Sequence, residues 1–256
     1  MVTFLLFAFA CRENRLNEPA SANPAAAGFD EAGSDPEAIE IADAVMEAMG
    51  GRKSFDDTRY LAWNFFGFRT HVWDKQTGDL RFEQGPLLTL MNVRSKKGRV
   101  WRDGEEVTDA AALAEALQAG YESWVNDSYW LLMPYKLKDS GVTLKHLGDG
   151  TTEAGRDAHV LQLTFRDVGV TPDNKYHVYV DKERMLVEQW SYFESYEDEE
   201  PGFKTPWAQW TRHGEILLSG DRGERQLSDI RVFSELPRAV FESPEPVVDL
   251  GALGSI

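Results

Sequence analysis

The chain has 256 residues, of which 42% are hydrophobic and 27% charged, the composition of a globular protein with one large domain or two small ones. A formal net charge of -16 argues against nucleic acid as a partner and gives the folded part no attraction to anionic membrane surfaces. The single cysteine, Cys11, excludes an intrachain disulfide framework and a multi-cysteine metal site.

The first eleven residues, MVTFLLFAFAC, join a short apolar run to this cysteine. A helix that spans a bilayer takes roughly 20 residues, whereas a shorter apolar run ending in small residues is typical of an export signal. The stretch Ala8-Phe9-Ala10-Cys11 resembles the lipobox of bacterial lipoproteins, in which the chain is cut before a cysteine that carries lipid. We therefore expect a signal peptide over 1–10 and lipidation of Cys11. Two alternatives stay open. The start of the chain is truncated, since no Lys or Arg precedes the apolar run, or the apolar terminus contains a cysteine by chance.

A polar stretch follows the cysteine. Residues 12–35 are rich in Ala, Pro, Asn, Glu and Ser and have no sustained apolar period. Such a composition cannot bury enough surface to offset the cost of ordering the chain. We expect a disordered tether over 11–35, a folded domain over 36–245 and a flexible tail over 246–256. Arg12, in place of the Asp that retains many lipoproteins in the inner membrane, favours the outer membrane, with its face left open.

A helix is predicted from residue 36 to the glycines that follow it. Asp35 suits the N-cap, and Pro36 suits the first helical position, where its missing N–H costs nothing. Gly50 and Gly51 suit the left-handed turn that ends a helix. The apolar side chains lie on one face: Ile39, Ala42, Met46 and Met49.

Strand signals follow the helix. Residues 58–75, TRYLAWNFFGFRTHVWDK, are dense in aromatic and β-branched side chains and predict a strand covered on both faces. Residues 75–85 predict a turn at Thr77-Gly78 and a strand with Leu80 and Phe82 inward. Residues 86–107 predict two strands around a turn at 96–98.

Residues 108–132 interrupt the strands with a pattern of helical period. Leu113, Leu117, Tyr121 and Trp124 share one stripe, three and four residues apart. We expect Gly120 to weaken this helix midway and residues 126–128 to restart it. Pro134 marks its end, because the residue before a proline avoids helix.

The rest of the chain predicts strands without intervening helices, which favours antiparallel pairing. These strands cover 142–147, 159–165, 175–180, 185–193, 207–213, 215–219 and 227–233. The order of elements predicts an α+β, mainly β fold: one curved antiparallel sheet with helices on one face.

Three stretches resemble an uncharacterised family of bacterial secreted lipoproteins: FRTHVWDKQTGDLRFE, NDSYWLLMPYKLKDSGVTL and YHVYVDKERMLVEQWSYFE. That family is similar in fold to the periplasmic lipoprotein carriers and outer-membrane acceptors of the localisation-of-lipoproteins system (LolA/LolB-like). The resemblance runs from about residue 38 to about residue 242. It implies an open half-barrel with helices packed on its concave face, enclosing an apolar cavity for acyl chains.

The aromatic side chains are candidates for lining such a cavity, with the filling of a solid core as the alternative. The candidates are Trp63, Phe65, Trp73, Tyr121, Trp124, Trp130, Trp190, Tyr192, Trp207 and Trp210.

Two polar candidates lie in residues 69–75. His71 and Asp74 are three apart, so in a strand they point to opposite faces, and structural hydrogen bonding is the favoured role of His71. The other histidines are scattered without metal-ligand spacing, and we expect no metal and no cofactor. Asp74, Asp127 and Glu188 are the acid–base candidates of an enzymatic alternative, although no nucleophile elbow, phosphate loop or dinucleotide fingerprint is present.

The acidic stretch at 194–210 lacks the spacing of a calcium loop and predicts a solvated surface loop.

Taken with the lipobox-like start and the aromatic candidates, the favoured function is the non-catalytic binding of a hydrophobic molecule, a lipid or a lipidated protein, by a lipid-anchored envelope protein. A structural or protein-interaction module with a filled core is the second hypothesis, and an extracytoplasmic hydrolase is the third.

Overall fold

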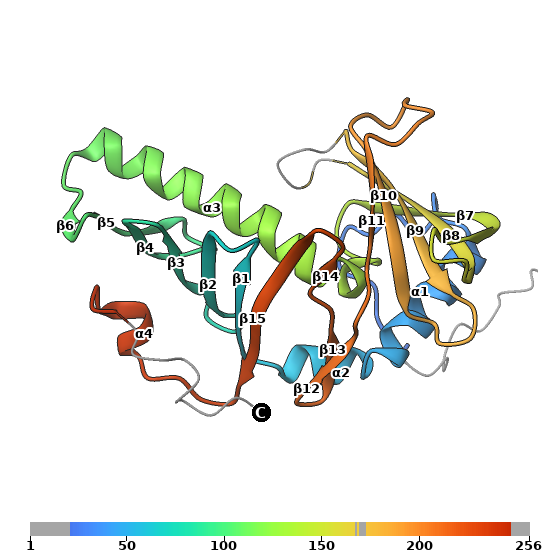
Figure 1. Ribbon diagram of the computed structural model, residues 1–256, viewed down its shortest axis with the longest axis horizontal. Coiled ribbons are helices and arrows are strands. Elements are labelled where there is room, and N and C mark those ends of the chain that lie inside the picture. Colours follow the sequence, from blue (N-terminus) through green and yellow to red (C-terminus); the bar gives the residue numbers. More distant parts are fainter. Residues whose placement is uncertain (1–20, 167, 169–172, 247–256) are drawn as a thin grey trace, which may run out of the picture.

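Antiparallel strands in two large sheets form the framework of the protein (Figure 1). The computed structural model describes residues 21–166, 168 and 173–246. The fold class is confirmed, since the protein is mainly β with antiparallel sheets and helices packed against them. The strands are divided between sheets of eight, five and two strands, where the sequence predicted a single curved sheet.

The eight-stranded sheet begins at one edge with two strands from the C-terminal part of the chain and continues through the first strands of the domain. Its order is β14 (Asp221–Arg222), β15 (Arg225–Phe233), β1 (Tyr60–Phe65), β2 (Arg69–Asp74), β3 (Asp79–Gln84), β4 (Leu87–Asn92), β5 (Lys97–Arg102) and β6 (Glu105–Glu106). The antiparallel pairing of β15 with β1 joins segments more than 150 residues apart, which no local pattern indicates.

The five-stranded sheet is a meander with one added edge strand. Its order is β11 (Phe203–Pro206), β10 (Val187–Phe193), β9 (Lys175–Asp181), β8 (Asp157–Phe165) and β7 (Val142–Thr151). A separate hairpin pairs β12 (Thr211–His213) with β13 (Ile216–Leu218). The strand predicted over 207–213 is thus limited to its last three residues, and β11 lies within the stretch predicted as a surface loop.

The sequence predicted one strand over 58–75, and this prediction is wrong. The stretch forms two strands, β1 and β2, that pair with each other around a tight turn. Phe66 and Gly67 both adopt positive φ, of 55° and 82°. The side chain of Asn64 fixes this turn, because its Oδ1 accepts from the Gly67 N–H at 2.7 Å and its Nδ2 donates to Thr70 Oγ1 at 3.0 Å.

The first helix, α1 (Pro36–Ala48), starts and ends where the sequence predicts. Its Asp35 carboxylate accepts from Lys145 Nζ and from the His146 N–H, both at 3.0 Å, and so ties the N-cap to β7 instead of to the helix. Gly50 is left-handed with φ 112°, and a Cβ there would lie 2.2 Å from the Glu215 carbonyl oxygen. A second short helix, α2 (Gly51–Asp57), follows directly.

The long helix α3 (Ala110–Leu132) runs along the eight-stranded sheet and reaches the five-stranded sheet (Figure 1). The interruptions predicted at Gly120 and at 126–128 do not occur. Gly120 lets the helix lie close to Thr89 of β4, and Asp127 is fixed by side chains of β2. The helix ends in a 3₁₀ turn (Met133–Lys136) that contains Pro134.

In the described part of the chain, three clusters of buried apolar side chains form the core. The largest joins α1, the C-terminal turn of α3, β1 and the five-stranded sheet. A second lies between α3 and strands β3 and β4. The third lies under the short helix α4 (Ala239–Glu242), with Tyr60, Ala62 and Val72 of β1 and β2. Helices therefore cover part of both faces of the eight-stranded sheet.

The segment before α1 differs from the expected tether. The backbone N–H groups of Ala26, Asp30 and Asp35 donate to the carbonyl oxygens of Lys138, Val142 and Leu144, at 2.9 to 3.0 Å. Phe29 packs against the main core. Residues 26–35 thus extend the domain along β7. The predicted signal peptide, Cys11 and the tail beyond residue 246 lie outside the described residues, and those boundaries stay predictions.

Candidate functional site

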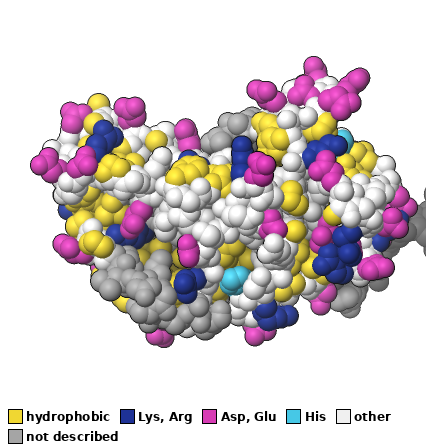
Figure 2. Space-filling view, viewed as in Figure 1, with side chains coloured by type: hydrophobic (Ala, Val, Ile, Leu, Met, Phe, Trp, Pro, Cys, Tyr) yellow, Lys and Arg dark blue, Asp and Glu magenta, His cyan; other side chains and the backbone are white. Residues whose placement is uncertain are grey.

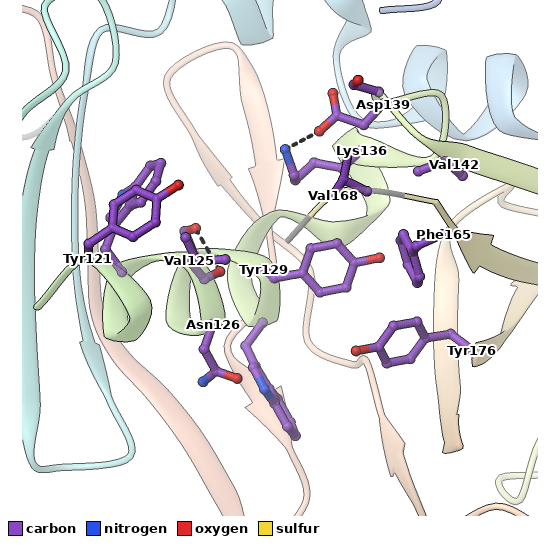
Figure 3. Close-up of a pocket in the computed structure, with 14 residues that line it drawn as sticks. Tyr121, Val125, Asn126, Tyr129, Lys136, Asp139, Val142, Phe165, Val168 and Tyr176 are labelled. Carbon is purple, nitrogen blue, oxygen red and sulfur yellow. Dashed lines mark hydrogen bonds and ion pairs between the residues drawn. The ribbon is translucent and has the colours of Figure 1, made fainter. Parts of the chain in front are cut away.

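A pocket of about 310 Å³ lies between the C-terminal half of α3 and the five-stranded sheet (Figure 3). Its residues come from α3, from the segment after it and from the adjoining ends of β7, β8 and β9. They are Tyr121, Trp124, Val125, Asn126, Ser128, Tyr129, Trp130, Lys136, Asp139, Ser140, Val142, Phe165, Val168 and Tyr176. The volume is at the lower end of the range of about 300–1,000 Å³ typical of small-molecule sites.

Aromatic rings form one wall of the pocket. Tyr129 projects from α3 toward Phe165 and Tyr176, with ring centroids 6.2 and 5.6 Å away (Figure 3). Tyr176 in turn stacks on Trp190 at 4.8 Å with an interplanar angle of 3°. Because Trp190 is fully buried, it supports the wall from behind and limits its movement.

Two polar atoms in this wall are buried without a hydrogen-bond partner among the described residues: the Tyr129 hydroxyl and the Trp124 Nε1. Burial raises the pKa of Tyr129 well above its usual value, so its hydroxyl keeps its proton. A buried unpaired hydroxyl costs free energy, and an acceptor in the pocket would recover it. An ion pair between Lys136 and Asp139 lies at another part of the lining (Figure 3).

Three of the predicted cavity candidates, Tyr121, Trp124 and Trp130, line this pocket. Four others are core residues almost without exposure: Trp63, Phe65, Trp190 and Trp207. For these four, the filled-core alternative describes the packing.

The remaining candidates are partly buried and hold elements together. Trp73 of β2 meets Trp124 edge-on at 5.1 Å, which places it next to the pocket. Tyr192 stacks on Phe203 at 4.8 Å. Trp210 donates from Nε1 to the Val187 carbonyl oxygen at 2.9 Å, so it fastens the chain after β11 to β10.

Several lining residues were missed from the sequence. Continuing the stripe of Tyr121 and Trp124 by three or four residues would have reached Val125 and Ser128, but the expected restart at 126–128 broke the pattern. Phe165 and Tyr176 reach the pocket through strand pairing, which depends on contacts remote in sequence.

His71 has the hydrogen-bonding role that was favoured for it. Its Nε2 lies 2.7 Å from Asp127 Oδ2, and Arg69 donates to Asp127 Oδ1, also at 2.7 Å. Burial is the main cause that lowers the pKa of His71, so the neutral ring donates from Nε2. Trp63 stacks on the other side of this ring at 4.5 Å. The cluster links α3 to β2.

Asp74 lies away from His71, as the strand geometry predicted. Its carboxylate accepts from Arg59 at 2.8 Å and from the N–H groups of Gln76 and Thr77 in the turn to β3. Burial alone would raise the pKa of Asp74, but the hydrogen bonds from Arg59 and the turn outweigh it and lower the pKa.

The three acid–base candidates do not converge on one site. Asp74 is bound by Arg59, Asp127 by Arg69 and Glu188 by Arg184. Each carboxylate therefore serves its own ion pair, and none of the three lines the pocket.

The acidic loop between β10 and β11 is exposed, as predicted. Figure 2 shows Asp and Glu side chains gathered at this end of the molecule. Glu197, Glu199 and Glu200 are exposed, as is the ring of Tyr196. Lys175 fastens the loop by donating to the carbonyl oxygens of Tyr196 and Asp198.

The structure also brings together His146, Asp149 and His159, which the sequence did not group. Their ligand atoms all lie within 4.8 Å of one another. None of the three residues lines the pocket.

No helix in the described part of the chain is long and apolar enough to cross a membrane.

Neither a family model nor a curated protein matches the chain. Among solved structures it is similar to a DUF1329 family protein from Desulfovibrio piger, with 13% identity over 86% of this chain and 100% of that chain, at a TM-score of 0.43. A putative outer membrane lipoprotein-sorting protein domain from Vibrio parahaemolyticus gives 10% identity, 80% and 96% coverage and a TM-score of 0.40. A LolA superfamily protein from Nitrosomonas europaea gives 9% identity, 80% and 96% coverage and a TM-score of 0.38.

Proposed function

We propose that the protein binds one hydrophobic molecule, a lipid or the lipid group of another protein, in the pocket beside α3, without catalysing a reaction. The observation that carries this proposal is the preformed pocket of about 310 Å³ with its aromatic wall. Most of the molecule's other tryptophans are packed in a filled core, so the open space beside α3 is a local feature and not a general looseness of packing.

The lining fits a ligand with an apolar body and one acceptor. Each methylene that moves from water into such a site contributes about 0.8 kcal/mol. The Tyr129 hydroxyl is placed to donate to a carbonyl or carboxylate oxygen, which would fix the ligand's orientation. An ester or a fatty acid meets both requirements.

We further propose that the protein works at the cell envelope, anchored through lipid on Cys11, in the outer membrane. The lipobox-like stretch before Cys11 and the Arg at position 12 support this. Because residues from 26 onward are hydrogen-bonded to the domain, only 14 residues separate Cys11 from the first of them, Ala26. The 15 residue steps from Cys11 to Ala26 span about 50 Å at most, so the pocket would work close to the membrane surface.

Filling the pocket tests the ligand proposal. Val125→Trp places an indole in the pocket, and Gln118→Trp places the same side chain on the exposed face of the same helix. In the full chain carrying Cys11→Ser, uptake of the fluorescent probe N-phenylnaphthylamine and its displacement by palmitate should weaken at least tenfold in Val125→Trp. Gln118→Trp should bind as the parent does. A parent chain that takes up no probe, or equal binding by both variants, would refute the proposal.

Membrane fractionation tests the anchor separately. Expressed with its export signal, the parent should co-sediment with outer membranes, and Cys11→Ser should move to the soluble fraction. Continued sedimentation of Cys11→Ser would count against lipidation at this residue.

A further inference from the structure

A side-chain cluster on the β7–β8 hairpin has the donors and the spacing of a metal site. It consists of His146 and Asp149 on β7 and His159 on β8. His159 Nδ1 lies 3.6 Å from Asp149 Oδ1. Ligand bonds of about 2.0–2.1 Å in a tetrahedral zinc site place the ligand atoms about 3.4 Å apart, so this pair already has the required separation.

A β-bulge creates the cluster. His146 pairs with Leu161 and Asp149 pairs with His159, so three steps along β7 oppose two steps along β8. In a regular strand, residues three apart point to opposite faces, whereas the extra residue of a bulge returns them to the same face. Gly148, at φ 94°, supplies the unusual backbone conformation within this bulge.

The hydrogen-bond pattern of the two histidines suits ligation. His146 Nδ1 lies 3.0 Å from Glu37 Oε2 on α1, which assigns the ring proton to Nδ1 and leaves a lone pair on Nε2. That Nε2 is buried and has no hydrogen-bond partner among the described residues, and His159 Nδ1 is in the same condition.

The two oxygens of the Asp149 carboxylate have different neighbours. Lys182 donates to Asp149 Oδ2 at 2.6 Å, while Oδ1 lies 3.6 Å from His159 Nδ1. Lys182 competes with a bound cation, because its charge lies next to the same carboxylate.

We propose that His146 Nε2, His159 Nδ1 and an oxygen of Asp149 bind a divalent transition-metal ion, with Zn²⁺ as the best fit. Two imidazoles and one carboxylate form a donor set typical of zinc, with a fourth position left for water. Glu37 orients His146 through the hydrogen bond to Nδ1, the arrangement that zinc-ligating histidines usually have. The ion would connect α1 to the β7–β8 hairpin through this hydrogen bond. The sequence expectation of no metal is thereby replaced by a proposal that spacing alone could not reveal.

Zinc titration of the metal-free chain tests this proposal. The full chain should be purified without a histidine tag and with Cys11→Ser, because that thiol is itself a zinc ligand. Calorimetry should give one Zn²⁺ per chain, and Co²⁺ should give the visible absorption of a tetrahedral site. His159→Ala should abolish this binding, and Glu37→Gln should weaken it about 10- to 100-fold.

Two further variants keep the test independent of folding defects. Lys182→Gln should tighten zinc binding, because it removes the competing charge, whereas misfolding would only weaken it. His213→Ala removes a histidine on β12 outside the cluster and should bind as the parent does. The proposal is overturned if the parent binds no zinc, if His159→Ala retains the parent's affinity, or if His213→Ala loses as much as His159→Ala. Ligand binding in the pocket plays no part in these outcomes.

Discussion

Replacing Asp127 by Ala should strongly destabilise the protein, because this carboxylate is the point where α3 is fixed to β2. It is fully buried and accepts from Arg69, His71 and the neighbouring Asn126, at 2.7, 2.7 and 2.9 Å. Its removal leaves the His71 Nε2–H without its acceptor at a cost of about 1–3 kcal/mol. It also leaves the Arg69 charge without its counter-ion.

Partial exposure to solvent reduces the free-energy cost of leaving Arg69 without a counter-ion. Breaking a fully buried ion pair costs about 3–5 kcal/mol, but the Arg69 side chain is 18% exposed and regains some hydration. We therefore expect a loss of about 3 kcal/mol for Asp127→Ala. That is a large part of the roughly 5–15 kcal/mol by which domains are stable. Asp127→Asn, which keeps an acceptor for His71 but not the charge for Arg69, should cost less, about 1–2 kcal/mol.

Equilibrium urea unfolding at pH 7.5 and 25 °C, followed by tryptophan fluorescence, measures these losses. Glu115→Ala is the matched control, since it removes a carboxylate from the exposed face of the same helix. The control should change the free energy of unfolding by no more than about 0.5 kcal/mol. If Asp127→Ala costs no more than Glu115→Ala, the cluster does not hold the helix and the reasoning fails.

Three further changes have expected signs. Tyr135→Phe should cost about 1 kcal/mol in the same urea assay, because the hydroxyl lies 3.0 and 2.7 Å from the carbonyl oxygens of Met49 and Leu217; no loss would show these contacts to be unimportant. Gly120→Ala should raise the melting temperature, because the added Cβ meets no atom closer than 3.4 Å and alanine favours helix over glycine by up to about 1 kcal/mol. A lowered melting temperature would contradict this. Burial first, and then the charge of Lys175, lowers the pKa of His177 from 6.5 to about 4. As the pH falls, His177 is protonated in the unfolded chain before it is protonated in the folded chain. The free energy of unfolding should therefore fall as pH drops from about 6.5 toward 4. His177→Gln should flatten that part of the pH profile of urea midpoints, and an unchanged profile would argue against His177 as a cause.

Local patterns predicted the elements that depend on neighbouring residues. The limits of α1 followed from Pro36 and from the glycines at 50 and 51, whose conformational demands are local. The strands of the β7–β10 meander likewise followed from alternation and from turn residues. The turn at Phe66-Gly67 was missed because apolar residues flank it on both sides, which outweighed the single turn signal of Gly67.

Contacts between remote segments were beyond such patterns. Neither the division into two large sheets nor the pairing of β15 with β1 is encoded in any window of the sequence. The same holds for the sites. His71 and Asp127 are 56 positions apart, and only the packing of α3 on β2 brings them together. The histidine cluster needed a bulge whose position depends on strand register.

The Tyr129 hydroxyl offers a test of the ligand's chemistry. It faces the aromatic wall, buried and without a hydrogen-bond partner among the described residues, so a ligand oxygen is the acceptor we expect it to meet. Tyr129→Phe removes one hydrogen bond of about 1 kcal/mol and should weaken palmitate binding roughly fivefold. Binding of N-phenylnaphthylamine, which has no oxygen acceptor, should stay the same or tighten, because the ring remains and an unpaired polar atom is lost. Competition titrations of both ligands on parent and variant measure the two affinities. Equal weakening of both would mean that the substitution deforms the pocket, and an unchanged palmitate affinity would mean that the hydroxyl does not contact the head group.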